Sequence, residues 1–151
     1  ELGQVPGTGL YRNVRRFQDL IIDPQVLIVR FDANLYFGNT NHFREKLEDM
    51  ITSKGNALKA IIINAESIAS LDSSAIHALF DLAEDLKQRN IKLCFSGVIG
   101  PVRDAMKKGK VVERIGENNF FMSVHAAYLA LDPEIDNVKD RPFIFQSNIE
   151  G

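Results

Sequence analysis

Three short apolar runs, separated by stretches with helical spacing, constrain this chain more than any other feature of its sequence. The runs are Val26–Phe31, Ala60–Ile63 and Ile91–Phe95, and the first two are rich in β-branched residues. Continuous runs of this length are typical of strands that are buried on both faces of a parallel sheet. Because helical stretches separate these strands along the chain, the pattern predicts an α/β layer structure in a single domain.

Four stretches have the apolar spacing of a helix with one buried face. The predicted helices cover residues 39–53, 71–89, 100–109 and 124–132, and a short edge strand is expected over 119–122. With the strands above, we expect about five strands in one central mixed sheet. The side chains predicted to face inward are Phe43, Leu47, Met50 and Ile51 in the first helix, Ile76, Leu79, Phe80, Ala83 and Leu86 in the second, Val102, Ala105 and Met106 in the third, and Val124, Ala127, Tyr128 and Leu131 in the last.

The two ends of the chain lack these patterns. Residues 1–9 are interrupted by proline and glycine, so we expect a flexible linker without regular structure, and the sequence reads as part of a longer polypeptide. Residues 10–132 are predicted to form the domain, beginning with a strand over 10–17. Residues 133–151 are expected to be loosely ordered, or ordered only against a partner. The predicted buried residues of the first strand are Tyr11, Val14 and Phe17.

The composition is that of an ordinary soluble domain. Of the 151 residues, 45% are apolar and 25% are charged, and the formal charge of −2 argues against a nucleic-acid partner. The single cysteine, Cys94, excludes an internal disulfide and a cysteine-built metal site, and its apolar surroundings predict a buried thiol. No apolar run approaches the roughly 20 residues that a membrane-spanning helix needs.

Three segments resemble the STAS domain, which is shared by SulP anion transporters and bacterial anti-sigma factor antagonists. Residues 26–47 begin with VLIVRFDANLYF, residues 60–75 read AIIINAESIASLDSSA, and residues 115–130 read IGENNFFMSVHAAYLA. The first and last are similar to the transporter version of the domain. Residues 2–15, LGQVPGTGLYRNVR, also resemble the stretch that joins the last membrane helix of a transporter to its STAS domain.

This resemblance implies a non-catalytic regulatory domain of a SulP-type sulfate or bicarbonate transporter, at the cytoplasmic face of the inner membrane. Its expected partners are the membrane domain of the same transporter, a second copy in a homodimer, or a cytosolic protein. The alternative is a stand-alone anti-sigma factor antagonist that is switched by phosphorylation. A third hypothesis, a small nucleotide hydrolase, has little support, because Gly7-Thr8-Gly9 lacks the Lys-Ser/Thr ending of a phosphate-binding loop. No cofactor is therefore assigned.

Asp72, Ser73 and Ser74 open the second predicted helix and have two interpretations. Asp72 or a serine can cap the helix by accepting hydrogen bonds from its first N–H groups, at about 1 kcal/mol. The resemblance implies a second role, because antagonists are phosphorylated at the position of Ser73. A phosphate there would face the positive end of the helix and alter partner docking. Ala75 departs from the antagonist pattern, which has glycine at that position.

A basic stretch follows the third predicted strand and includes Arg103, Lys107, Lys108, Lys110 and Arg114. A solvated helix face is the ordinary interpretation of such charges. In a domain that hangs below a membrane, the same residues could contact anionic headgroups, at about 1 kcal/mol per residue near the surface. Three further arginines near the linker, at positions 12, 15 and 16, would fit that arrangement.

No motif in the sequence combines the residues that a catalytic site or a metal site would need. His42, His77 and His125 have no metal-ligand spacing, and each is expected to be a surface or capping residue. No nucleophile stands beside a base in any motif. We therefore expect no enzyme activity and no metal site.

Overall fold

The parallel sheet that the apolar runs predict forms the centre of the molecule. The computed structural model describes residues 1–6, 8–31, 38–131 and 144–146. Strands β4 (Val26–Arg30), β5 (Ala60–Asn64), β6 (Lys92–Ser96) and β7 (Phe120–Phe121) lie side by side in that order, and every pair is parallel. The predicted edge strand over 119–122 is thus confirmed as β7.

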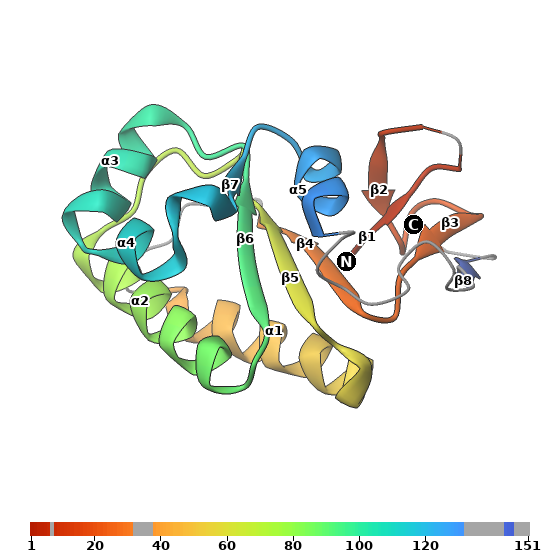
Figure 1. Ribbon diagram of the computed structural model, residues 1–151, viewed down its shortest axis with the longest axis horizontal. Helices are drawn as coiled ribbons and strands as arrows, with labels where there is room; N and C mark the ends of the chain where they lie inside the picture. The colour runs from red at the N-terminus through yellow and green to blue at the C-terminus, as the bar shows by residue number, and fades with distance from the viewer. Residues whose placement is uncertain (7, 32–37, 132–143, 147–151) are drawn as a thin grey trace.

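Helices cover both faces of this sheet (Figure 1). On one face pack α1 (Thr40–Lys54), α2 (Ser73–Gln88), α3 (Gly100–Lys108) and α4 (Val111–Ile115), and on the other packs α5 (Val124–Leu131). Short 3₁₀ turns, η1 (Gly55–Ala57) and η2 (Glu117–Asn119), follow α1 and α4. Alternate residues of a strand point to opposite faces, so Ile61 and Ile63 contact the first group while Ile62 contacts α5.

The predicted helices are confirmed with small shifts of their ends. Leu47, Leu86, Met106 and Leu131 are among the buried residues that the helical spacing predicted. The segment 111–115 was not predicted to be a separate helix. Lys110 has a backbone φ of 68°, which ends the preceding helical turn and redirects the chain into α4.

A second sheet lies beside the first and corrects two expectations. Strands β1 (Leu2–Gln4), β2 (Tyr11–Asn13), β3 (Leu20–Ile22) and β8 (Ile144–Gln146) pair antiparallel in the order β2-β1-β3-β8. The strands therefore divide between two sheets, each with one kind of pairing, instead of sharing one mixed sheet. The expected linker over 1–9 contains β1. Of the expected loose tail over 133–151 only residues 144–146 are described, and they form β8; the rest of that expectation lies outside the described residues.

The strand predicted over 10–17 is confirmed in part as β2, and short strands explain why the rest of this second sheet escaped prediction. Each covers only three residues, too few for an alternating pattern to emerge. The turn between β1 and β2 is closed by the hydrogen bond from Val5 N to Leu10 O, at 2.8 Å. Phe17, predicted to be buried, is 45% exposed, because β2 ends at Asn13 and the chain turns away before position 17.

Candidate functional site

The turn before α2 has the capping geometry that the sequence predicts. Asp72 Oδ1 accepts a hydrogen bond from Ala75 N at 2.8 Å, and Asp72 itself stays in an extended conformation, outside the helix. This bond satisfies one of the N–H groups that a helix start leaves without an intrahelical partner. Capping by Asp72 is therefore confirmed.

Ser73 and Ser74 are the first two residues of α2, and the fold leaves Ser73 exposed and Ser74 half-buried. Ala75, in contrast, is fully buried beneath them. A group attached to Ser73 would therefore stand in solvent near the positive end of a 16-residue helix. Partner docking at these residues stays a prediction.

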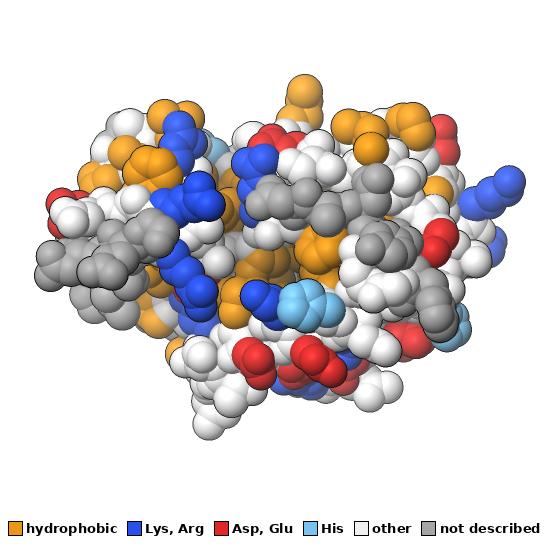
Figure 2. Space-filling model, turned by 180° about the vertical axis from the view of Figure 1, so that it is seen from behind, with side chains coloured by type: hydrophobic (Ala, Val, Ile, Leu, Met, Phe, Trp, Pro, Cys, Tyr) orange, Lys and Arg blue, Asp and Glu red, His pale blue; other side chains and the backbone are white. Residues whose placement is uncertain are grey.

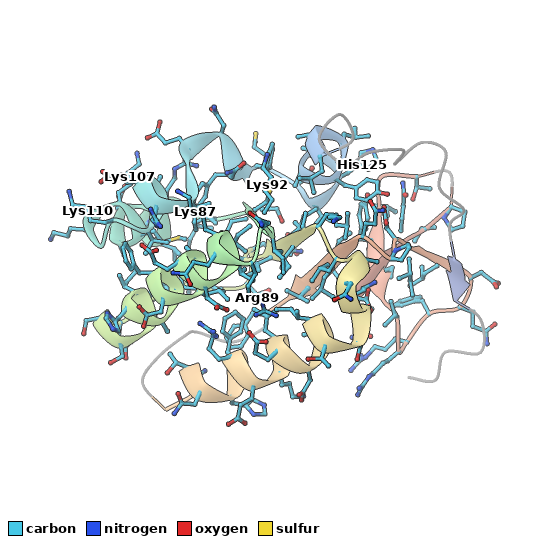
Figure 3. All side chains as sticks on the ribbon, turned by 60° about the horizontal axis from the view of Figure 1, so that its bottom comes forward. Lys87, Arg89, Lys92, Lys107, Lys110 and His125 are labelled. Atoms are coloured by element: carbon cyan, nitrogen blue, oxygen red, sulfur yellow. The ribbon has the colours of Figure 1, made fainter. Side chains whose placement is uncertain are left out.

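The basic residues after β6 separate into two environments. Lys107, Lys108 and Lys110 are exposed around the end of α3, and Lys110 Nζ lies 3.8 Å from Glu113. Figure 3 shows Lys107 and Lys110 pointing outward at the end of the molecule opposite His125. Arg103 is different, because its guanidinium lies over the ring of Phe120, 4.9 Å from the centroid. The structure thus gathers the three lysines and sets Arg103 apart.

Arg114 also belonged to the basic stretch, but it pairs with Glu84 and so ties α4 to α2. Arg89 has a similar role between α2 and α1, where it hydrogen-bonds Glu48 and Asp85 (Figure 3). Partial burial lowers the pKa of Arg89, but hydrogen bonds to the two carboxylates more than reverse this and raise it. These two arginines stabilise helix packing.

The three histidines lie apart from one another. His42 is exposed on α1, and His77 Nε2 lies 3.4 Å from Asp81 on the outer face of α2. Within the described ranges, no cluster of three or more His, Cys, Asp or Glu could hold a metal ion. His125 has a contact that sequence reasoning missed, since its Nδ1 lies 3.2 Å from the hydroxyl of Tyr11.

This contact belongs to a polar seam that fastens the second sheet to α5. The rings of Tyr11 and Tyr128 are 6.4 Å apart, and the Tyr128 hydroxyl donates to Asp23 Oδ2 at 2.6 Å. Asp23 and Tyr128 are both buried. Burial raises the pKa of the Tyr11 hydroxyl, because it disfavours the charged phenolate. We call Tyr11, Asp23, His125 and Tyr128 the tyrosine seam.

A groove between the two sheets is the other feature that the sequence did not reveal. It has a volume of about 560 Å³ and is lined by Arg12 and Arg16 on one side and Arg30 and Asn64 on the other. We call it the arginine groove. Sequence reasoning noted the basic residues at 12 and 16, but only the fold brings them near Arg30, which lies at the end of β4.

In the part of the chain that the structure describes, every helix is too short or too polar to cross a bilayer.

Comparisons with known proteins agree on one family. Residues 18–127 match the family described as the STAS domain. Sulfate transporter 1.3 of Arabidopsis thaliana is 30% identical over 144 residues, covering 90% of this chain and 22% of the transporter. Probable sulfate transporter 4.2 of the same plant is 36% identical over 135 residues, covering 83% of this chain and 20% of that protein. The chain thus spans about a fifth of the length of these curated relatives.

Solved structures show the same fold. The murine Solute Carrier 26 family member A9 anion transporter superposes with a TM-score of 0.75 at 25% identity, over 87% of this chain and 22% of that one. The STAS domain of a SulP transporter from Vibrio cholerae gives 0.64 at 20% identity, over 76% and 87%. A putative anti-sigma factor antagonist from Thermotoga maritima gives 0.63 at 16%, over 77% and 94%. At these identities the last two comparisons concern the fold alone, and they confirm the predicted STAS-like α/β fold.

Proposed function

Because this chain belongs to the STAS domain family, we propose that it is the non-catalytic regulatory domain of a SulP-type anion transporter. The observation that carries the proposal is the match to sulfate transporters over 83–90% of the chain, at 30–36% identity. Stand-alone antagonists resemble the chain in fold at lower sequence identity.

The proposed partner is the membrane domain of the same transporter, at its cytoplasmic face. The lysines around the end of α3 support this placement, because Lys107, Lys108 and Lys110 are exposed, and Lys107 and Lys110 point away from the body of the domain. Each such charge near an anionic surface contributes about 1 kcal/mol of attraction. Pairing with a second copy and binding of a cytosolic protein are further roles that the exposed Asp72–Ser74 turn would serve.

Anion uptake by the complete gene product tests the proposal. Cells that produce the whole protein should take up labelled sulfate, and removal of residues 1–151 should reduce that uptake by changing transport rate, assembly or delivery to the membrane. Surface labelling separates delivery from rate. Unchanged uptake after removal, or a reading frame without membrane-spanning segments, would contradict the proposal.

Charge reversal tests the proposed membrane-facing surface. Replacing Lys107, Lys108 and Lys110 by glutamate should weaken binding of the domain to vesicles that contain anionic lipid. The matched control replaces three exposed lysines elsewhere, Lys46, Lys59 and Lys87, by glutamate and so changes the net charge by the same amount. Equal loss in both variants would show that net charge, not this surface, controls the binding.

The second candidate is an antagonist switched at Ser73, favoured by the exposure of this serine beside the Asp72 cap. Incubation with a cognate anti-sigma kinase, followed by mass analysis, tests it. Phosphate that Ser73→Ala abolishes and Ser74→Ala leaves in place would support this function, and absence of phosphate would count against it.

A further inference from the structure

The arginine groove is placed where α/β proteins commonly bind small molecules. Arg30 is the last residue of β4 and Asn64 is the last residue of β5, so the groove lies at the carboxyl ends of two parallel strands. In open α/β sheets this is the edge at which ligands bind. The second sheet supplies the opposite wall through β1, β2 and the residues after β2. Its volume of about 560 Å³ is within the range of small-molecule sites.

The charges along the groove do not cancel. Two carboxylates line it, and each already has a cationic partner: Glu1 Oε2 lies 2.6 Å from Lys54 Nζ, and Glu66 Oε1 lies 3.2 Å from an Arg30 nitrogen. Arg12 and Arg16 have no carboxylate within ion-pair distance among the described residues. On the face seen in Figure 2, Lys and Arg side chains gather beside a hollow in the surface. The groove is therefore left with excess positive charge.

The groove also offers neutral donors and an apolar rim. Asn64 is 92% buried, and its Oδ1 accepts a hydrogen bond from Glu66 N at 3.1 Å. Among the described residues, the Nδ2 group of Asn64 has no acceptor, so this donor is available to a ligand in the groove that Asn64 lines. Phe17, which is 45% exposed, gives the rim an aromatic surface.

We propose that the arginine groove binds a small tetrahedral oxyanion of the sulfate or phosphate type, either free or at the end of an ester. Guanidinium groups present paired N–H donors that match the oxygens of such anions, and charge-assisted hydrogen bonds are the strong ones. Arg12 and Arg16 are the principal ligands, and Arg30 and Asn64 complete the donor set. The inference does not rest on the proposed function, because an isolated domain can be tested for it.

Nuclear magnetic resonance titration of the chain with sodium sulfate tests the site. Sodium chloride of equal ionic strength serves as the reference and removes effects of screening. We expect saturable shifts of the backbone amides of residues 12–17, 30 and 64–66. Separate titrations with inorganic phosphate and with a soluble inositol phosphate distinguish a free anion from an ester headgroup.

The double variant Arg12→Gln and Arg16→Gln should weaken sulfate binding by about tenfold or more, since each lost charge-assisted bond contributes measurably. Both side chains are exposed, so the fold should persist, which circular dichroism and thermal unfolding verify. Lys46→Gln with Lys87→Gln is the matched control, since both lysines are exposed and lie outside the groove, and it should bind as the parent does.

Similar affinities for sulfate and phosphate would support a site for free oxyanions, and tighter binding of the inositol phosphate would support an ester-borne one. Shifts that do not saturate, that sodium chloride reproduces, or that the control variant loses equally would overturn the proposal. Because these measurements use neither a transporter nor a kinase, their failure leaves the proposed function to its own tests.

Discussion

The two sheets of the molecule are stabilised in different ways. In the parallel sheet, β4, β5 and β6 have five residues each and their apolar side chains are almost completely buried, with Ile61 and Ile62 fully inaccessible. The antiparallel sheet has three-residue strands and leaves Phe17, just beyond it, largely exposed. It is held to the rest of the domain by Leu2 packing under α5 and by the tyrosine seam.

This difference indicates that the sheets should respond to different changes. Because the parallel sheet buries apolar side chains on both faces, its stability depends on how completely those side chains fill the core. The stability of the antiparallel sheet depends more on a few hydrogen bonds between polar groups. The loss of such a bond takes one hydrogen-bond partner from a buried group. The following variants probe these two kinds of stabilisation.

Truncation in the parallel sheet should have the largest effect. Ile61→Ala removes a fully buried side chain at the centre of the core and should lower the free energy of unfolding by about 2–5 kcal/mol. Urea unfolding followed by circular dichroism measures this change. Leu129→Ala, at a position that is 56% exposed on α5, is the control and should change it by less than about 0.5 kcal/mol. Equal effects would contradict the assignment of the core.

Loss of one hydroxyl from the tyrosine seam should rank second. Tyr128→Phe removes the donor to Asp23 Oδ2 and should destabilise the domain by about 1–3 kcal/mol, because a buried carboxylate loses one of its hydrogen-bond donors. Amide hydrogen exchange should then accelerate more in β1 and β3 than in β5. Uniform acceleration in both sheets would show that the seam supports the whole fold and not the antiparallel sheet in particular.

The cap of α2 tests a purely local contribution. Asp72→Ala removes the acceptor for Ala75 N and should cost about 1 kcal/mol of stability. Thermal unfolding at neutral pH measures the loss. Ser73→Ala, one residue further along the same turn, should change stability by less than about 0.5 kcal/mol. A larger effect at Ser73 than at Asp72 would reverse the roles assigned to the two residues.

The smallest effect should be a dependence on alkaline pH. Burial raises the pKa of Tyr11 above its ordinary value of about 10, so the folded state holds this proton more tightly than the unfolded state. The resulting stability is complete below pH of about 10 and declines as pH rises beyond it. Tyr11→Phe should show a shallower decline in unfolding experiments across that range. Parallel curves for the two proteins would contradict a buried, titrating Tyr11.

Features formed within a short stretch of sequence could be predicted, and features formed by residues distant in the chain could not. The cap at Asp72 and the exposure of Lys107 were predictable, because both follow from local sequence around a helix end. The tyrosine seam was not, since its members at positions 11, 23, 125 and 128 are far apart in the chain. The arginine groove could not be predicted either, because its walls come from residues as distant in the chain as Arg12 and Asn64.

The sequence by itself determined the parallel strands, the helices that cover them and the STAS resemblance, because apolar periodicity and caps are encoded within short windows. The tertiary structure alone decided that the N-terminal residues form a sheet with β8 and pack against α5. A strand of three residues is too short to show a recognisable pattern in the sequence. Contacts with distant parts of the chain supply the stabilisation that such a strand needs.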